Sequence, residues 1–280
     1  MTRLSTLLAA LALFMGAIPT LASAMINDRA VARMVAFGGS CTGCELSGRK
    51  LAGARFMGAD FSGAALVGSD LRGALFHGSV FNGADLSRAD LSESQMMGAS
   101  FARARLTDAD LRRAELNGAT FIAANLSGSD LRDTEGGGAS FTGANLSDAR
   151  FDGAELNAVD FSRVNARGAR FDDSELNQAN LRGARFDGSS FRDAELNQAN
   201  LQGGVFAGAD FQGASLKRAN IAGVDLSKTR GLSQSQLKQA CGDAATRAPS
   251  GLVVYSCSGR RMSPPTPPPP PVLTFRPPPR

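Results

Sequence analysis

Proline is absent between Met25 and Ala248, although the whole chain contains 12 prolines. Proline has no backbone N–H and interrupts regular hydrogen bonding. Every residue of this stretch therefore keeps its backbone donor, as a structure stacked along its whole length would require.

Residue types that carry catalysis are scarce. His77 is the one histidine of the chain, and no nucleophile with a neighbouring base, phosphate-cradling glycine loop or metal-ligand spacing accompanies it. The run Gly136-Gly137-Gly138 lacks the strand and helix context of a nucleotide site. We therefore expect no enzyme activity, no catalytic residue, no cofactor and no resident metal.

Long apolar runs are limited to residues 7–21, which follow Arg3 and precede Ala22-Ser23-Ala24. This order of a basic start, an apolar middle and small residues is typical of a secretory signal. We expect a signal peptide over residues 1–24, cleavage near Ala24, and a periplasmic or secreted protein. No later run is long enough to suggest a membrane span.

Cysteine is limited to two residues near each end of the chain, Cys41 and Cys44, and Cys241 and Cys257. In an oxidising compartment these residues are candidates for structural disulfides. A thiol-disulfide activity of Cys41 and Cys44 is one alternative, and a metal site, which would need all four thiolates from both ends, is the other. Glu45 stands where a c-type haem motif requires histidine.

No charge sign dominates the body of the chain. Residues 42–228 hold 20 basic and 24 acidic side chains, whereas residues 229–280 hold seven basic and one acidic. A mixed surface is not typical of a nucleic-acid-binding groove. We therefore expect no nucleic-acid partner.

A period of five fills most of the chain. Every fifth residue from Leu46 to Leu226 is a central residue, giving 37 consecutive units, and 35 of these centres are Leu, Phe, Met or Ile. Gly136 and Ala166 are the exceptions. The residue two positions earlier is Ala in 24 units and Ser in six.

A period of five fits neither a helix nor a flat strand, so the chain must turn a corner in each unit. If each unit forms one side of a four-sided coil, the centre and the small residue before it point inward. Twenty residues then complete one turn, with about 4.8 Å between coils. Glycine recurs two residues after the centre, as at Gly58 and Gly63, where a corner needs backbone freedom.

These units resemble the pentapeptide-repeat family, in which Ala, Asp or Asn, and Leu or Phe precede two variable residues. Ala84-Asp85-Leu86-Ser87-Arg88 is one such unit, and the resemblance covers residues 44–228. It implies an all-β solenoid, a right-handed quadrilateral β-helix of about nine coils with short helical caps at both ends. Residues 232–252 also resemble the closing segment of exported bacterial members.

The expected domains follow from these observations. They are the signal peptide (1–24), an N-terminal cap (25–43), the repeat helix (44–228), a disulfide-containing C-terminal cap (229–257) and a proline-rich tail (258–280). A short helix is expected within residues 28–37. A second is expected from Ser233 as N-cap through Cys241, with Gly242 as its stop. The tail is expected to be a disordered or polyproline II spacer, or a ligand for an aromatic groove.

Central residues that are twenty positions apart should lie on the same side of consecutive coils. The centres therefore predict four buried columns. One column holds phenylalanine from Phe61 to Phe161, and the column two sides earlier changes from leucine to phenylalanine at Phe151. Gly136 and Ala166 remove bulk near this change. We expect stacked rings, and a local bend, cavity or change of core width near residues 151–161.

The outward residues predict one line of like charge, which is a candidate binding strip. Its members repeat at about 5 Å, and they are Glu115, Glu135, Glu155, Glu175 and Glu195. Such a row favours a cationic partner or a divalent cation, although a solvated face of the scaffold would have the same composition. A second ladder mixes aspartate and arginine, as at Asp70 and Arg72, and predicts mutual compensation.

The sequence thus predicts a non-enzymatic interaction or structural scaffold of the cell envelope, with an unknown protein partner bound through outward faces. The alternatives are the thiol-disulfide protein and a DNA-mimicking, topoisomerase-binding protein. The latter use, known in the family, would require a cytoplasmic location and a strongly acidic surface. The expected signal peptide and the mixed charge argue against it.

Overall fold

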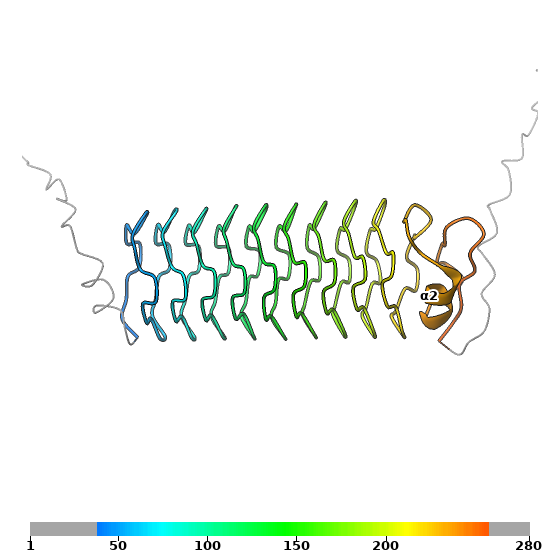
Figure 1. Ribbon diagram of the computed structural model, residues 1–280, viewed down its shortest axis with the longest axis horizontal. Helices are drawn as coiled ribbons and strands as arrows, with labels where there is room; N and C mark the ends of the chain where they lie inside the picture. The colour runs from blue at the N-terminus through cyan, green and yellow to red at the C-terminus, as the bar shows by residue number, and fades with distance from the viewer. Residues whose placement is uncertain (1–37, 258–280) are drawn as a thin grey trace, which may run out of the picture.

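The computed structural model describes residues 38–257, which form a straight rod of stacked, four-sided coils (Figure 1). Nearly every unit contributes an isolated parallel bridge to the coil twenty residues on, as in Ser100↔Thr120 and Asn200↔Asn220. The chain between residues 38 and 257 forms no strand longer than such a bridge. The twenty-residue turn expected from the sequence is confirmed.

The bridge ladder starts before residue 44, where the repeats were expected to begin. The Gly38 N–H donates to the Met57 carbonyl at 2.8 Å, and Ser40 pairs with Asp60. The first coil therefore includes the end of the segment expected as an N-terminal cap.

The four sides of the coil are named here by the central residues that point inward from each. Face 1 contains Leu46 and every twentieth residue after it, and faces 2, 3 and 4 start in the same way at Leu51, Phe56 and Phe61. Along each side the residues before and after the centre point outward. The residue two after the centre forms the corner to the next face.

Each corner is a four-residue turn that the backbone closes on itself. The Ala84 N–H donates to the Phe81 carbonyl at 3.0 Å, and the equivalent bond recurs at most corners. The corner residue has a positive φ, such as 65° at Gly78, as the third residue of a type II turn requires. Fifteen of the corners with a positive φ use a residue other than glycine, among them Arg88 and Ala123.

We expect Gly78→Ala to lower the free energy of unfolding by about 1 kcal/mol, because a left-handed backbone strains any residue with a Cβ. A Cβ added at Gly78 would meet no atom within 4 Å, so the backbone alone accounts for the loss. Ala123→Gly, at a corner with φ of 55°, should change stability in the opposite direction. Urea denaturation of both variants measures this, and the same sign for both would contradict it.

The small inward residues make room for the large centres and hydrogen-bond where they are serine. Five of the buried serine hydroxyls donate to the carbonyl of the preceding centre at 2.6–2.8 Å, and they belong to Ser69, Ser94, Ser129, Ser174 and Ser189. Each hydroxyl is thus buried with its donor satisfied, which removes most of the cost of burying a polar group.

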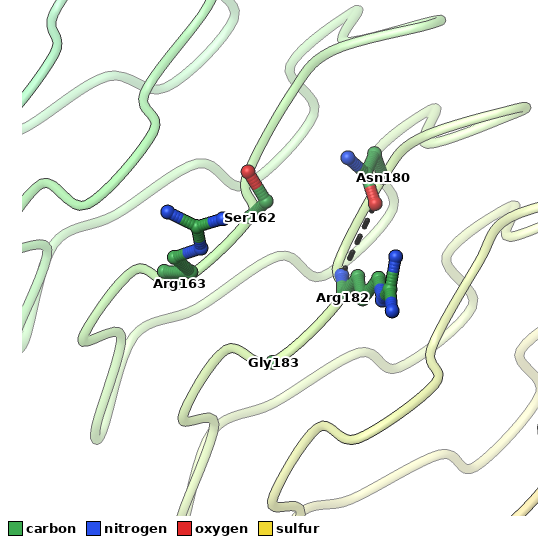
Figure 2. Close-up of a pocket in the computed structure, with 5 residues that line it drawn as sticks. All are labelled: Ser162, Arg163, Asn180, Arg182 and Gly183. Carbon is green, nitrogen blue, oxygen red and sulfur yellow. Dashed lines mark hydrogen bonds between the residues drawn. The ribbon is translucent and has the colours of Figure 1, made fainter.

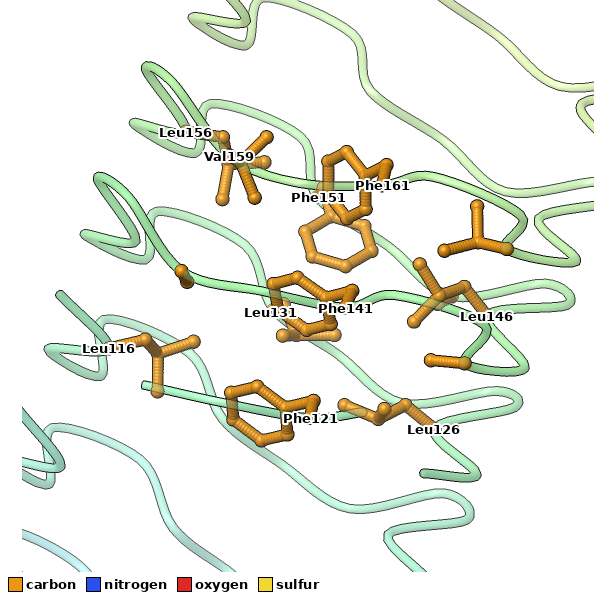
Figure 3. Packing of buried hydrophobic residues seen from close by; sticks show 14 of the residues in the cluster. Leu116, Phe121, Leu126, Leu131, Phe141, Leu146, Phe151, Leu156, Val159 and Phe161 are labelled. Carbon is orange, nitrogen blue, oxygen red and sulfur yellow. The ribbon is translucent and has the colours of Figure 1, made fainter. Parts of the chain in front are cut away.

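The predicted phenylalanine column is confirmed on face 4. The ring centroids of Phe61 and Phe81 are 4.9 Å apart, and those of Phe81 and Phe101 are 4.8 Å apart, with nearly parallel planes. The column continues through Phe121 and Phe141 in the same geometry (Figure 3). All of these rings are buried.

The change of columns near residue 151 alters ring packing and leaves the rod straight. Phe141 and Phe161 are tilted by 31°, and Phe151 meets both edge to face from the opposite side. The coils in this region remain in line with their neighbours (Figure 1), so the expected bend is not seen. At Gly136, the Leu156 side chain occupies the vacated space, since its Cδ2 lies 2.8 Å from where a Cβ would be.

The C-terminal end continues the winding with a helix in place of one side. Helix α2 spans Gln234–Gln239 and begins after the predicted N-cap Ser233, whose hydroxyl accepts from the Gln236 N–H. It ends with Ala240 as C-cap, before the expected end at Cys241. The reason is that Cys241 returns to the ladder by pairing with Asn220.

Two disulfides lie near the two ends of the rod. Cys41 is joined to Cys44, and Cys241 to Cys257. The signal peptide (1–24), the helix expected within residues 28–37 and the proline-rich tail (258–280) lie outside the described residues.

Candidate functional site

The side chains that most often bind metals, His, Cys, Asp and Glu, are not clustered in the described part of the chain. Within residues 38–257, no three or more His, Cys, Asp or Glu side chains are placed to hold a metal ion. His77 lies on face 3 and contacts Gln95, with 3.1 Å between Nε2 and Oε1. Cys41 is buried as well as disulfide-bonded, which limits its access to a substrate thiol.

The predicted glutamate strip forms one continuous row on face 3. Parallel bridges join the five residues in order, from Glu115↔Glu135 to Glu175↔Glu195. Apart from Glu115, which is half-buried, the side chains are exposed. None of the five carboxylates has a cation within 4.0 Å among residues 38–257.

Asparagine side chains form a second row beside the glutamates and hold two of them in place. Asn157 Nδ2 donates to Glu175 Oε2 at 2.8 Å, and Asn177 Nδ2 donates to Glu195 Oε2 at 3.0 Å. The side-chain oxygen Oδ1 of Asn177 accepts from the backbone N–H of Asn197 at 3.3 Å. These bonds orient the carboxylates without neutralising them.

Three aspartates add to the strip at the corner between faces 2 and 3, and the sequence interpretation did not include them. Asp133, Asp173 and Asp193 each precede a strip glutamate by two residues. No ion pair involves them within the part of the chain that the structure describes. Sorting the corner residues by twenty, as was done for the centres, would have found them. We call these eight carboxylates the acidic strip.

Face 2 carries seven outward aspartates, but their charges are compensated. Arg72 contacts Asp70 at 2.8 Å, and Arg170 bridges Asp152 and Asp172 at 3.0 Å each. The hydrogen bond from Arg72 lowers the pKa of Asp70. The predicted mutual compensation on this face is therefore seen. Because the arginine side chains of these pairs are more than half exposed, each pair contributes little net stability.

A shallow pocket of about 350 Å³ lies between two coils where face 4 turns into face 1. Ser162 and Arg163 line it from one coil, and Asn180, Arg182 and Gly183 from the next (Figure 2). Neither arginine has an acidic partner within 4.0 Å among residues 38–257. Two unpaired guanidinium groups give this edge a positive charge, in contrast to the acidic strip.

Membrane insertion by a helix finds no support in the described residues, since none of their helices is both long and apolar enough to cross a bilayer.

Similarity to known proteins covers most of the coil. The family described as "Pentapeptide repeat region" matches residues 104–181, and "Pentapeptide repeats (8 copies)" matches residues 40–78, 66–101 and 194–230. No curated protein sequence matches the chain.

Three solved structures show partial similarity. HetL, a pentapeptide repeat protein involved in heterocyst differentiation regulation from the cyanobacterium Nostoc, is 30% identical over 64% of this chain and 84% of its own, with a TM-score of 0.33. A trypsin-treated form of QnrB1, a plasmid-mediated fluoroquinolone resistance protein, is 23% identical over 60% and 86%, also with a TM-score of 0.33. A pentapeptide repeat protein from the Arabidopsis thaliana thylakoid lumen is 29% identical over 49% and 70%, with a TM-score of 0.20. Together with the unbroken five-residue period and the four-sided coil, the family matches establish that this chain belongs to the pentapeptide repeat family.

Proposed function

We propose that this chain is a non-enzymatic interaction scaffold of the cell envelope that binds a basic protein partner along the acidic strip. The observation that carries the proposal is the contrast between two neighbouring faces. Face 2 offsets its aspartates with arginines of its own, whereas the acidic strip has no cation within 4.0 Å among residues 38–257.

The charge spacing supports a cationic partner. Like charges about 5 Å apart repel one another, and bringing cations against them relieves this cost. One turn of an α-helix rises 5.4 Å, close to the coil spacing. A partner helix with one Lys or Arg per turn would therefore place a cation near each glutamate over several turns.

A divalent cation fits the strip less well than a protein does. Calcium takes six to eight oxygen ligands that converge on one point. The acidic strip offers one glutamate per coil in a straight row, and no three acidic side chains of the described residues are grouped to hold a metal. The strip thus favours an extended partner over a single ion.

The envelope location rests on the signal sequence expected in residues 1–24. Fractionation of cells that express the tagged chain tests it, and recovery only from cytosol would contradict it. A photo-crosslinking residue at position 178, at the corner between faces 3 and 4, should capture the partner in the same cells. The matched control is position 148, an exposed corner between faces 1 and 2 with similar backbone φ, 58° against 62°.

We expect a variant with all five strip glutamates changed to glutamine to lose partner binding and to keep the fold. The substitution removes five negative charges, so binding to the crosslinked partner, or to polylysine as a probe, should weaken at least tenfold at low salt. Removal of like-charge repulsion should leave the melting temperature equal or higher. A control with Asp70, Asp110, Asp130, Asp152 and Asp172 changed to asparagine removes five charges from face 2 instead. Equal loss of binding in both variants would indicate a non-specific effect of net charge and contradict the proposal.

A further inference from the structure

The N-terminal half of face 3 places the one histidine of the chain between two exposed methionines. Met57, His77 and Met97 each follow a centre by one residue and are twenty residues apart. The Gly58 N–H donates to the His77 carbonyl at 2.9 Å, and the Gly78 N–H donates to the Met97 carbonyl at 3.0 Å. The three residues therefore lie on consecutive coils, in one outward column.

The two methionines are unusual for outward positions. Met57 is 37% exposed and Met97 is 44% exposed, although most outward residues of the rod are polar or small. Met96, next to Met97 in the sequence, is a buried centre. The alternation of side chains points Met96 into the core and Met97 toward solvent. Burial in the core therefore does not explain why a methionine stands at position 97.

Spacing allows the three side chains to meet. The rings of Phe56 and Phe76, which are the centres next to Met57 and His77, stack at 5.3 Å and so measure the distance between these coils. A methionine side chain has three rotatable bonds and adapts to its surroundings. Thioether sulfurs from the coil below and the coil above can therefore reach the level of the imidazole between them.

A hydrogen bond leaves one nitrogen of the imidazole available. His77 Nε2 lies 3.1 Å from the carbonyl oxygen Oε1 of Gln95, an atom that can only accept. In the neutral tautomer in which Nε2 donates this bond, Nδ1 keeps its lone pair. Histidines that bind metals commonly donate their second N–H to a carbonyl or carboxylate, which fixes the ring and the tautomer.

We propose that Met57, His77 and Met97 form a binding site for a soft monovalent metal ion of the Cu(I) and Ag(I) class, with two thioether sulfurs and Nδ1 as ligands. Thioethers select soft ions such as Cu(I), whereas carboxylate and carbonyl oxygens select calcium and magnesium. All three ligands are neutral, which suits an ion of single charge. This site is separate from the acidic strip, and it does not depend on the proposed protein partner.

Silver titration followed by NMR tests the site without a reductant, so the two disulfides stay intact. The purified chain, with 13C-labelled methionine methyl groups, is titrated with silver nitrate in a chloride-free buffer. We expect the methyl signals of Met57 and Met97 to shift together and to reach saturation at one equivalent. The buried Met96 is the internal control, and its signal should not move. Zinc should leave all three signals unchanged.

Variants that remove the proposed ligand atoms test whether Met57, His77 and Met97 bind the silver ion. Met57→Leu with Met97→Leu keeps the side-chain size and removes both sulfurs, and His77→Gln keeps a polar side chain and removes Nδ1. Each should lower the silver affinity at least tenfold without a change in melting temperature. Ile122→Leu, at an exposed position of face 4, should leave the affinity unchanged.

Three results would overturn the proposal. They are silver affinity unchanged in the double leucine variant, methyl shifts confined to Met25, Met34 or Met262, and shifts that continue past one equivalent without a break. If the Met57 and Met97 signals respond to a captured protein partner but not to silver, the column is a protein contact and the metal site is wrong.

Discussion

Phe121→Ala is expected to lower the free energy of unfolding by about 3–5 kcal/mol, the range for removing a fully buried phenylalanine. The Phe121 ring lies between Phe101 and Phe141, with centroids 4.8 and 4.7 Å away. The substitution therefore removes two stacking contacts and leaves a cavity in the middle of the rod. Urea denaturation, followed by far-UV circular dichroism, measures the loss.

The neighbouring residue supplies the control for this experiment. Ile122 is 46% exposed on face 4. Because surface substitutions usually change stability by about 0.5 kcal/mol or less, Ile122→Ala should have a small effect. Similar losses in the two variants would mean that the alternation of inward and outward positions is misassigned.

The coil could be predicted from the sequence because one rule decides its core. A single register places every centre from Leu46 to Leu226 inward, and no insertion shifts it. The stacked rings of Phe61 and Phe81 follow directly, since residues twenty apart face the same side of consecutive coils. Local sequence and global winding agree in each unit, which is typical of a sequence that specifies one structure.

The end of the coil was harder to predict because the register changes there. Asn220 pairs with Cys241 and Asp225 pairs with Arg247, so the last turn contains one and then two extra residues. The sequence located the start of α2 through the capping signal at Ser233. Its end was misplaced because the return of Cys241 to the ladder is a tertiary contact with no local signal.

The surface was predictable in composition but not in pairing. The row of strip glutamates could be read by sorting residues by twenty, but Asp133 and its two equivalents stand at corners that were interpreted only as glycine positions. Whether an arginine bonds within its own unit, as Arg72 does, or to another coil, as Arg192 does with Asp210, depends on side-chain rotamers. The five-residue period therefore does not predict which aspartate each arginine contacts.

The unit around Ala166 reverses the usual order of sizes. Most units bury a small residue and then a large centre, but here Val164 stands at the small position and Ala166 at the centre, and both are buried. The small volume of Ala166 at the centre is thus partly compensated by the larger Val164, two residues earlier. The larger residue at position 164 thus reduces the cavity that was expected near Ala166.

Placing a large residue at position 166 should therefore lower the free energy of unfolding unless Val164 is replaced by a smaller residue as well. We expect Ala166→Leu alone to cost about 1–3 kcal/mol, since Val164 already occupies part of the room and overpacking forces strained rotamers. Val164→Ala alone should cost about 1 kcal/mol or more through the cavity that it leaves. The double variant recreates the common Ala-Asn-Leu unit, so its stability should lie closer to the parent than the sum of the two losses. Urea denaturation of all four proteins gives the coupling energy as a double-mutant cycle. Additive losses would show that the two side chains do not share one space, and that size complementarity within a unit does not govern this core.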